Sequence, residues 1–334
     1  MQNKKNKLSA LAGLTQTVLT IVFLAGIVFV NGFWTEAKAS IEISFAYSLS
    51  NFSGPIPYNW VNLFVDEPRN EIYVVDPQER EIRVFNANGM EVFTFGDDGS
   101  LGAVFDVAVE KNGDILVLSK DNSSFPILRC NFRGEVIGKI TLSDFPSWLS
   151  DFSPTRMICR NELLYLMDVV SMKIAVTSMD GLFKNGYDLM SLLEIPPDKM
   201  FGTEAGGFNV DGNGNMLFTV PVLFSAYTLS PEGELKGFGT PGSAPGRFGV
   251  VGGIAADESG NIFVADRLRS VVLIFDSQFK FQKEFGYRGS LPDNLISPTN
   301  LVIDGKDKLY VSQFRSRGIS VFKISHAVPE HQAN

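Results

Sequence analysis

Histidine and cysteine are nearly absent from this sequence. The chain has 334 residues but only two of each, and both histidines, His326 and His331, lie beyond the last predicted strand. With no imidazole between Ser40 and Ser325, the body of the fold lacks the base of a Ser-His-Asp triad and the common nitrogen ligand of zinc. No Cys-x-x-Cys-His segment is present to attach a haem. We therefore predict no catalytic residue, no cofactor and no metal ligand from these residue types, while sites built from carboxylates and amides stay open.

Basic residues are also fewer than acidic residues. The 29 lysines and arginines are outnumbered by 37 aspartates and glutamates, which gives a formal charge of −8 and a pI near 5.0. Proteins that bind a phosphate backbone usually carry a basic face, so nucleic acid is not an expected partner. The remaining composition, with 45% apolar and 20% charged residues, is that of an ordinary globular protein.

One long hydrophobic run stands at the start of the chain. Lysines at three of the first seven positions precede an uncharged stretch, residues 8–35, and Ala37 and Ala39 have the spacing that a signal peptidase reads. We predict that residues 1–39 are a signal peptide or an uncleaved membrane anchor, because the stretch is long enough to span a bilayer. Both alternatives place the rest of the chain outside the cytoplasm, as a periplasmic, membrane-anchored or secreted protein. Removal of this segment leaves a formal charge of −11.

Beyond this segment, one pattern recurs six times, at intervals of 43 to 52 residues. A short apolar segment follows a polar turn, and further apolar runs lie before and after it. Four such runs per unit, rich in Val, Ile, Phe and Tyr and separated by Gly and Asn, predict short antiparallel strands. The recurring segments are 72–76, 115–119, 164–168, 216–220, 262–266 and 309–313.

The later runs of each unit predict its third and fourth strands. Each recurring segment is followed by a third run, assigned to residues in five units, and a fourth run follows another turn in five units. The third runs are 82–85, 127–130, 174–177, 272–275 and 319–322. The fourth runs are 91–95, 135–141, 182–189, 234–238 and 280–285.

Six four-stranded antiparallel units in one chain favour an all-β fold, a six-bladed β-propeller, because radial closure hides the sheet edges and buries the blade faces. The last unit has no fourth strand, since only a polar tail, residues 326–334, follows its third. At the other end, residues 41–49 alternate apolar and polar side chains, as an unpaired strand should. We predict that this N-terminal strand closes the last blade and that the propeller spans residues 40–325.

The residues from Phe238 to Phe248, which read Phe-Gly-Thr-Pro-Gly-Ser-Ala-Pro-Gly-Arg-Phe, resemble the start of an NHL repeat, and the resemblance continues to Phe275. Blade 1 is similar between Asn70 and Gly96, and the likeness covers residues 57–324. It is weaker in blades 2 to 4, where serine and valine stand at the aspartate position of the family. The resemblance implies a six-bladed propeller and no single activity, because such propellers include scaffolds, nucleic-acid binders and a few lyases.

Asp211-Gly-Asn-Gly-Asn215 spaces three oxygen side chains like the start of a calcium loop. The glycine and the distal acid of such a loop are missing, because Met216 and Val222 stand at their positions. The same kind of turn recurs once per unit, between the first and second strands. Repetition in every unit indicates turn chemistry rather than metal binding.

The predicted export would place Cys130 and Cys159 in an oxidising compartment, where a disulfide can form. In the repeat, Cys130 takes the position of Phe85, and Cys159 takes that of Val65. Both therefore replace core residues. We expect two free buried thiols, with a bridge between neighbouring blades as the alternative.

Two sets of positions are expected to share one mouth of the central channel, because strands alternate in direction. The first set is the entry of each innermost strand, which comprises Asn62, Asp106, Arg156, Gly207, Gly253 and Asn300. In this set, Arg156 interrupts a pattern whose equivalent residues are small or neutral in most blades. A guanidinium near a narrow axis is costly unless it meets Asp106 or an anion.

The second set lies on the connections between second and third strands. Its aspartates cap their own turns in the simplest interpretation, and its arginines are then a solvated rim. In the functional interpretation, the two sets form a polar funnel for an anionic ligand or an acidic protein surface. The set comprises Asp76, Arg80, Asp168, Lys173, Asp266, Arg267, Arg269, Arg315 and Arg317.

The sequence therefore predicts an exported propeller that acts as a non-catalytic binding or assembly module for a protein partner or an anionic ligand. The alternative is an axial-metal-dependent hydrolase or lactonase. Six-bladed propellers similar to gluconolactonase hold a divalent ion at the axis with carboxylates and amides, but their motif is not found here. The expected ligand-binding residues are Asn62, Asp106, Arg156, Asn300, Arg267, Arg269, Arg315 and Arg317.

Overall fold

The computed structural model describes residues 40–51, 54–55, 61–121, 125–314 and 318–327. The chain divides into two units, one made of residues Ile41–Ser325 and the other of Met1–Ser40 with His326–Asn334. The predicted signal or anchor segment, residues 1–39, lies outside the described residues. Within the described ranges, no helix is long and apolar enough to cross a membrane.

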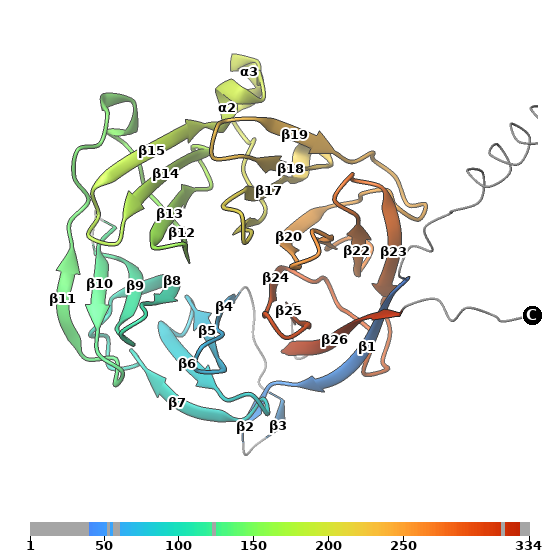
Figure 1. Ribbon diagram of the computed structural model, residues 1–334, viewed down its shortest axis with the longest axis horizontal. Coiled ribbons are helices and arrows are strands. Elements are labelled where there is room, and N and C mark those ends of the chain that lie inside the picture. Colours follow the sequence, from blue (N-terminus) through green and yellow to red (C-terminus); the bar gives the residue numbers. More distant parts are fainter. Residues whose placement is uncertain (1–39, 52–53, 56–60, 122–124, 315–317, 328–334) are drawn as a thin grey trace, which may run out of the picture. The chain divides into compact units, whose positions relative to one another are not determined.

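Six four-stranded antiparallel sheets stand as blades around a ring (Figure 1), which confirms the predicted six-bladed β-propeller. In blades 1 to 5, strands that follow one another in sequence are also neighbours in the sheet, from the axis to the rim. Blade 1 holds β4 (Asn62–Asp66), β5 (Glu71–Asp76), β6 (Glu81–Phe85) and β7 (Glu91–Phe95). Blade 2 holds β8 (Ala103–Val109), β9 (Ile115–Lys120), β10 (Ile127–Cys130) and β11 (Val136–Ile140), and blade 3 holds β12 (Arg156–Arg160), β13 (Leu163–Asp168), β14 (Lys173–Ser178) and β15 (Phe183–Asp188).

The second half of the ring repeats this plan. Blade 4 holds β16 (Phe208–Val210), β17 (Met216–Val220), β18 (Ser225–Leu229) and β19 (Leu235–Phe238). Blade 5 holds β20 (Val251–Ala256), β21 (Ile262–Asp266), β22 (Val271–Phe275) and β23 (Phe281–Gly286), and blade 6 holds β24 (Asn300–Ile303), β25 (Lys308–Ser312), β26 (Ile319–Ala327) and β1 (Ser40–Ser48). The minor elements are β2 (Ser50–Asn51), β3 (Gly54–Pro55), η1 (Ser147–Leu149), α2 (Leu189–Leu192), α3 (Pro197–Met200) and η2 (Pro221–Leu223).

The second strand of each blade is buried along almost its whole length. In β17 and β21 every residue is buried, and in β5 only Glu71 is not. Both faces of a blade pack against neighbouring blades, so these strands carry continuous apolar runs rather than an alternating pattern. This double burial is why the second strand gave the clearest repeat in the sequence.

The N-terminal strand closes the ring, as predicted. Strand β1 lies on the outer side of β26 and is the fourth strand of blade 6 (Figure 1). The Leu49 amide donates to the Ile319 carbonyl at 3.0 Å, and the Ser325 hydroxyl donates to the Glu42 carbonyl at 3.5 Å, so the two strands run antiparallel. Ile41 and Leu49 are buried, whereas Glu42, Ser44 and Ala46 are exposed, which places the apolar face of this segment against the core.

We expect deletion of residues 41–50 to abolish cooperative melting or to cause aggregation. The deletion exposes the edge of β26 and uncovers the apolar face that Leu49 helps to cover. The measurement is thermal unfolding of the parent and the truncated chain, followed by circular dichroism and light scattering.

A point variant separates lost packing from a general effect of truncation. Leu49→Ala should destabilise the fold by about 2–5 kcal/mol because the side chain is fully buried. Ala46→Ser, on the exposed face of β1, should change stability by less than about 0.5 kcal/mol. Equal melting of the truncated chain and the parent would show that β1 is not the closing strand.

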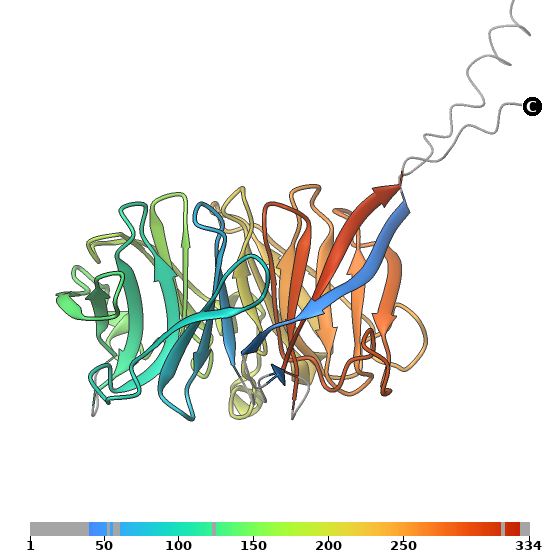
Figure 2. The ribbon, with the colours of Figure 1, turned by 90° about the horizontal axis from the view of Figure 1, so that it is seen from below.

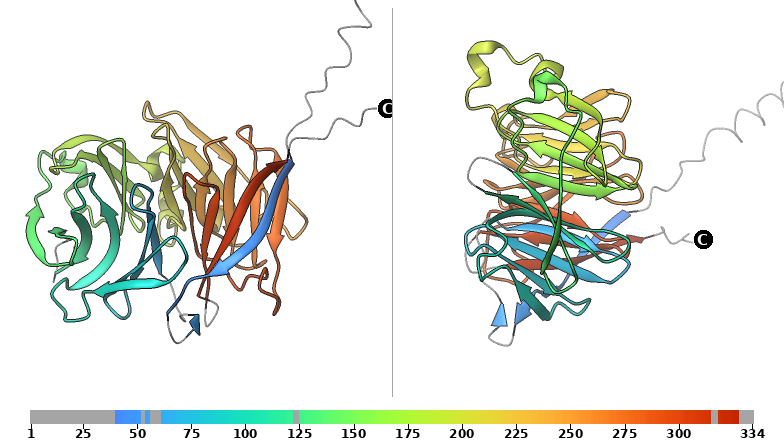
Figure 3. Two further views of the ribbon diagram at one scale, coloured as in Figure 1. Left: turned by 60° about the horizontal axis from the view of Figure 1, so that its bottom comes forward. Right: turned by 90° about the vertical axis from the view of Figure 1, so that its left-hand side faces the viewer.

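The two faces of the ring are built from different connections. One face, which we call the mouth face, carries the connections between second and third strands and the links from one blade to the next. The opposite face carries the turns between first and second strands and between third and fourth strands. Figures 2 and 3 show the blade strands running from one face to the other.

Three details differ from the sequence prediction. The third strand of blade 4, β18, to which the sequence analysis assigned no residues, follows the η2 turn and Phe224 in the left-handed conformation, with φ of 52°. The segment between blades 3 and 4 contains the short helices α2 and α3, which the sequence analysis did not assign. Strand β26 continues to Ala327, past the predicted boundary at residue 325.

Both cysteines are free in the structure. Cys130 is fully buried in the core between blades 1 and 2, where burial raises the pKa of its thiol to about 11. Cys159 is only partly buried, packs against a different cluster, and has its sulfur 3.7 Å from the sulfur of Met179. Burial raises the pKa of the Cys159 thiol too.

We expect both thiols to react slowly with alkylating reagents at neutral pH without denaturant, and Cys130 more slowly than Cys159. A raised pKa lowers the thiolate fraction, and the thiolate is the nucleophile. The combined Cys130→Val and Cys159→Val variant should change stability by only about 1–2 kcal/mol. A mass spectrum of the unreduced protein that lacks two hydrogens would instead show a disulfide.

Candidate functional site

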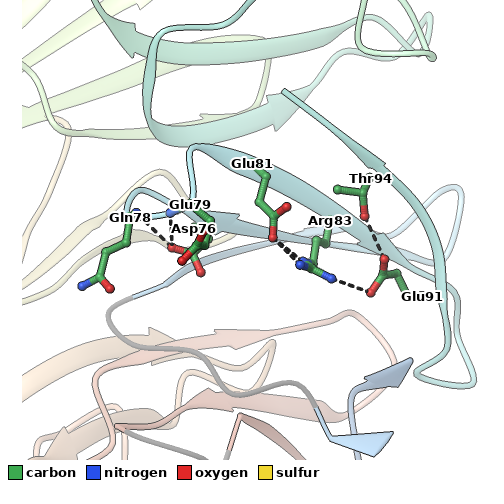
Figure 4. Close-up of polar contacts among 7 residues, drawn as sticks. All are labelled: Asp76, Gln78, Glu79, Glu81, Arg83, Glu91 and Thr94. Carbon is green, nitrogen blue, oxygen red and sulfur yellow. Dashed lines mark hydrogen bonds and ion pairs between the residues drawn. The ribbon is translucent and has the colours of Figure 1, made fainter. Parts of the chain in front are cut away.

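The aspartates that end the second strands cap turns of their own blades. In blade 1, Asp76 Oδ1 accepts hydrogen bonds from the amides of Gln78 and Glu79 at 2.9 and 3.2 Å (Figure 4). Asp168 does the same in blade 3 and also accepts from the amide of Ser153 at 3.1 Å, which ties down the loop that leads into β12. These carboxylates are therefore occupied by backbone amides, as the simpler interpretation of the sequence predicts.

In blade 5, Asp266 plays the same role with more partners. Its carboxylate accepts hydrogen bonds from the amides of Gly249, Val250 and Arg269, at 2.5 to 3.2 Å. The Asp266 turn thus holds the entry of the inner strand β20 in place. On the outer half of blade 1, Figure 4 also shows Arg83 between the carboxylates of Glu81 and Glu91.

The calcium-like segment is also a capped turn. Asp211 Oδ1 accepts from the amides of Asn213 and Asn215, and Oδ2 accepts from the Asn215 side chain, at 2.8 to 2.9 Å. Asp257 and Asp304 make equivalent bonds in blades 5 and 6. Among the described residues, no three His, Cys, Asp or Glu side chains come together as a metal cluster.

Hydrogen bonds link the inner strands of neighbouring blades around the axis. Asn300 Nδ2 donates to Asn62 Oδ1 at 3.0 Å, and Asn62 Nδ2 donates to the Phe105 carbonyl at 2.6 Å, which joins blades 6, 1 and 2. The Met157 amide donates to Asp106 Oδ2 at 3.0 Å and joins blades 2 and 3. Three of the polar residues predicted at the channel entry thus serve first as links between blades.

On the other side of the axis, the links involve glycines. The Thr219 hydroxyl donates to the Gly252 carbonyl at 2.7 Å, and the Gly253 amide donates to the Thr299 carbonyl at 2.8 Å. A Cβ on Gly253 would lie 2.7 Å from the backbone of Asn300, so this close approach requires glycine. Thr219 belongs to the second strand of blade 4, β17. Among the described residues, no such bond joins the inner strands of blades 3 and 4.

A small pocket opens at the axis on the mouth face. Its volume is about 90 Å³. Arg156 of blade 3 lies in the wall at the junction where the inner strands of blades 3 and 4 have no linking bond. The lining comprises Val61, Asn62, Arg156, Gly206, Gly207, Phe208, Gly252, Gly253, Arg267, Thr299 and Asn300.

Burial shifts the pKa values of Asp106 and Arg156 in opposite directions. Asp106 is 4% exposed, and its burial raises the pKa of the carboxyl to about 6, although Arg156 and two backbone amides pull that pKa down. Burial likewise lowers the pKa of Arg156, and Asp106 partly offsets this effect. No ion pair joins the two side chains among the described residues. The guanidinium makes one hydrogen bond there, from Nη1 to the Thr155 carbonyl at 3.1 Å.

We expect the parent protein to lose stability relative to Asp106→Asn as the pH rises from about 4 to about 6. Because folding raises the pKa of Asp106, the folded state binds this proton more tightly, and the stabilisation is present at low pH and lost as the pH passes the folded-state value. A shift of about two pKa units corresponds to about 3 kcal/mol. Urea unfolding of both proteins across this range measures the difference, and a constant difference would contradict the expectation.

The predicted arginines of the rim have different environments. Arg267 lines the axial pocket, and burial lowers its pKa. Arg269 instead forms an ion pair with Glu284 of the outer strand β23 at 2.6 Å and is largely buried. It holds blade 5 together and does not line the axial pocket. Arg315 and Arg317 lie outside the described residues.

The mouth face also carries exposed apolar side chains that the sequence analysis did not single out. They come from the connections between second and third strands in blades 3, 4 and 5, and from the links between blades 3 and 4 and between blades 5 and 6. Large exposed apolar side chains that gather on one face of a protein can mark an interaction site. We call this set the apolar arc, which comprises Val170 at 61% exposed, Phe201 at 100%, Val222 at 51%, Leu268 at 72% and Leu291 at 63%.

Comparisons with known proteins identify the fold. No protein-family model matches the chain, so membership of the NHL repeat family is not confirmed. No curated protein matches it either. Solved structures with the same fold include enzymes, and at these identities the likeness shows the fold alone.

Three of these structures give the range of similarity. Virginiamycin B lyase from Staphylococcus aureus is 11% identical, with a TM-score of 0.51 over 86% of this chain and 99% of the lyase. A gluconolactonase from Xanthomonas campestris is 11% identical, with a TM-score of 0.53 over 86% of this chain and 92% of that protein. A luciferin-regenerating enzyme is 12% identical, with a TM-score of 0.54 over 86% and 98% of the two chains.

Proposed function

We propose that the propeller is a non-catalytic binding module that takes a protein partner on its mouth face, with an acidic side chain of that partner entering the axial pocket. The observation that carries this proposal is the Arg156 guanidinium, which lines the pocket and makes a single hydrogen bond among the described residues. A guanidinium has five N–H donors in a fixed fork that fits a carboxylate. Its remaining donors are therefore suited to a carboxylate brought in from outside.

The surroundings of Arg156 support the same ligand chemistry. Arg267 adds a second cation to the pocket wall, and Asn62 and Asn300 add amide groups. The protein is acidic overall, but charges on its distant surfaces are screened over about 8 Å at physiological salt. An approaching carboxylate is therefore governed by the local arginines.

The apolar arc supplies the second part of the proposed interface. Protein interfaces bury apolar anchors at their centre and keep charged pairs for register and selectivity. Leu268 follows Arg267 directly in the sequence, so the arc begins next to the pocket. The module would act outside the cytoplasm, attached to a membrane or released according to the fate of residues 1–39.

The alternative, an axial-metal-dependent hydrolase or lactonase, has less support from the residues at the axis. A divalent ion of this kind requires several oxygen ligands that converge on one point. Asp106 is the only carboxylate that the predicted entry ring supplies, and both of its oxygens accept backbone amides. Elemental analysis of the protein from its native source, with an assay of lactone hydrolysis, separates the two proposals.

The binding proposal is tested by isolating the partner and measuring its affinity. Proteins that co-purify from the native source identify the partner, and calorimetry then compares the parent with Arg156→Gln and Leu268→Asp. We expect each variant to weaken binding at least about tenfold, because central arginines and apolar anchors dominate interface energies. Added salt should weaken binding to the parent more than binding to Arg156→Gln.

Matched controls lie on the opposite face. Arg133→Gln and Phe132→Asp change an exposed arginine and a 72% exposed apolar side chain on the turn between β10 and β11. Both should leave the affinity unchanged. If Arg156→Gln unfolds more easily but binds the partner normally, Arg156 serves an internal interaction with Asp106 and the proposal is wrong.

A further inference from the structure

A second and larger pocket lies on the opposite face, at the seam where the first and last blades meet. Its volume is about 340 Å³, which falls within the range of small-molecule sites. The turn between β4 and β5 forms one side, and the turn between β24 and β25 forms the other. The lining comprises Val65, Glu67, Pro68, Asn70, Ile72, Ala87, Asp304, Gly305, Lys306, Lys308 and Tyr310.

The floor of this pocket is apolar. Ile72 and Tyr310 belong to the core cluster between blades 6 and 1, and Val65 packs against that cluster. The Tyr310 hydroxyl points to Asp304 Oδ2, at 3.4 Å. An apolar floor inside a polar rim is the usual construction of a site for an organic molecule with a hydrophobic body.

Two lysines on the rim donate hydrogen bonds to neutral groups. Lys308 Nζ donates to the Tyr47 hydroxyl at 3.2 Å and to the Ala87 carbonyl at 3.1 Å, and both acceptors are neutral. Lys306 Nζ donates to Asn70 Oδ1, which is also neutral. Neither lysine forms an ion pair among the described residues. The two ammonium groups are therefore placed to receive an anionic group of a ligand.

The acidic residues of the rim compete only weakly for these lysines. Asp304 Oδ1 accepts the amides of Lys306 and Lys308, so this carboxylate is held by its own turn. Glu67 is exposed and makes no side-chain hydrogen bond or ion pair among the described residues. The negative charge of Glu67 repels a bound anion. We therefore expect removal of this charge to strengthen anion binding.

Glycine at position 305 keeps the seam pocket open. A Cβ at Gly305 would lie 2.8 Å from Glu67 Oε2, so any side chain there enters the space between the two turns. The φ angle of Gly305 lies outside the left-handed region, and the backbone does not require glycine. Gly212 follows the capping aspartate of blade 4 in the same way, and a Cβ there would meet nothing within 4 Å.

We propose that the pocket at the seam of blades 6 and 1 binds a small amphipathic carboxylate. The hydrophobic body of the ligand lies on Val65, Ile72 and Tyr310, and the carboxylate accepts hydrogen bonds from Lys306 and Lys308. This site is independent of the axial pocket, because it lies on the other face and shares no lining residue with it.

Calorimetry of the full chain with 3-phenylpropionate tests the proposal, with 3-phenylpropanamide as a neutral comparison. We expect the carboxylate to bind at least tenfold more tightly than the amide. Lys306→Met and Lys308→Met should each weaken carboxylate binding several-fold, whereas Glu67→Gln should strengthen it. Melting temperatures of the unliganded variants show whether Lys308→Met loosens the contact with β1.

The glycine pair provides the matched control. Gly305→Leu should abolish binding of 3-phenylpropionate because its side chain fills the pocket, and Gly212→Leu should have no effect. Arg156→Gln should also leave binding unchanged, which distinguishes the seam pocket from the axial one. The proposal is overturned if the parent does not bind at millimolar concentration, if the amide binds equally well, or if Gly305→Leu binds like the parent.

Discussion

The pairing of β1 with β26 is the contact on which the rest of the ring depends. A propeller has no layer that covers it from outside, so each blade face is buried only while both neighbouring blades are in place. Without β1, the apolar face at Ile41 and Leu49 and the edge of β26 would be open to water. The pairing of β1 thus keeps water from the apolar faces of blade 6. Because neighbouring blades share buried faces, it also supports the other five blades.

The close approach of the inner strands sets the geometry at the axis. Gly207 and Gly253 let the backbones of blades 4, 5 and 6 approach one another closely, while Asn62 and Asp106 connect blades on the other side. Arg156 stands where this set of linking bonds is interrupted. Arg156, whose guanidinium is costly to bury, thus lies at a junction whose inner strands are not linked by such a bond among the described residues.

The fold was predictable from the sequence because double burial leaves an uninterrupted apolar signature in strands such as β5 and β21. Strand β18 was missed because Ser225 and Thr228 dilute its apolar pattern. Repeat spacing also placed Asn62, Arg156, Gly207, Gly253 and Asn300 at one pocket. The apolar arc and the ion pair of Arg269 depend on how loops pack across blades, and the repeat carries no information on those contacts.

Ring closure also has a kinetic consequence. The bond between Ser325 and Glu42 joins residues 283 positions apart in the sequence, so the first strand has no partner until nearly the whole chain has been synthesised. Such long-range pairing slows folding, and unpaired strand edges favour association between chains. Until blade 6 forms, β1 is thus an unpaired strand through which two chains could associate.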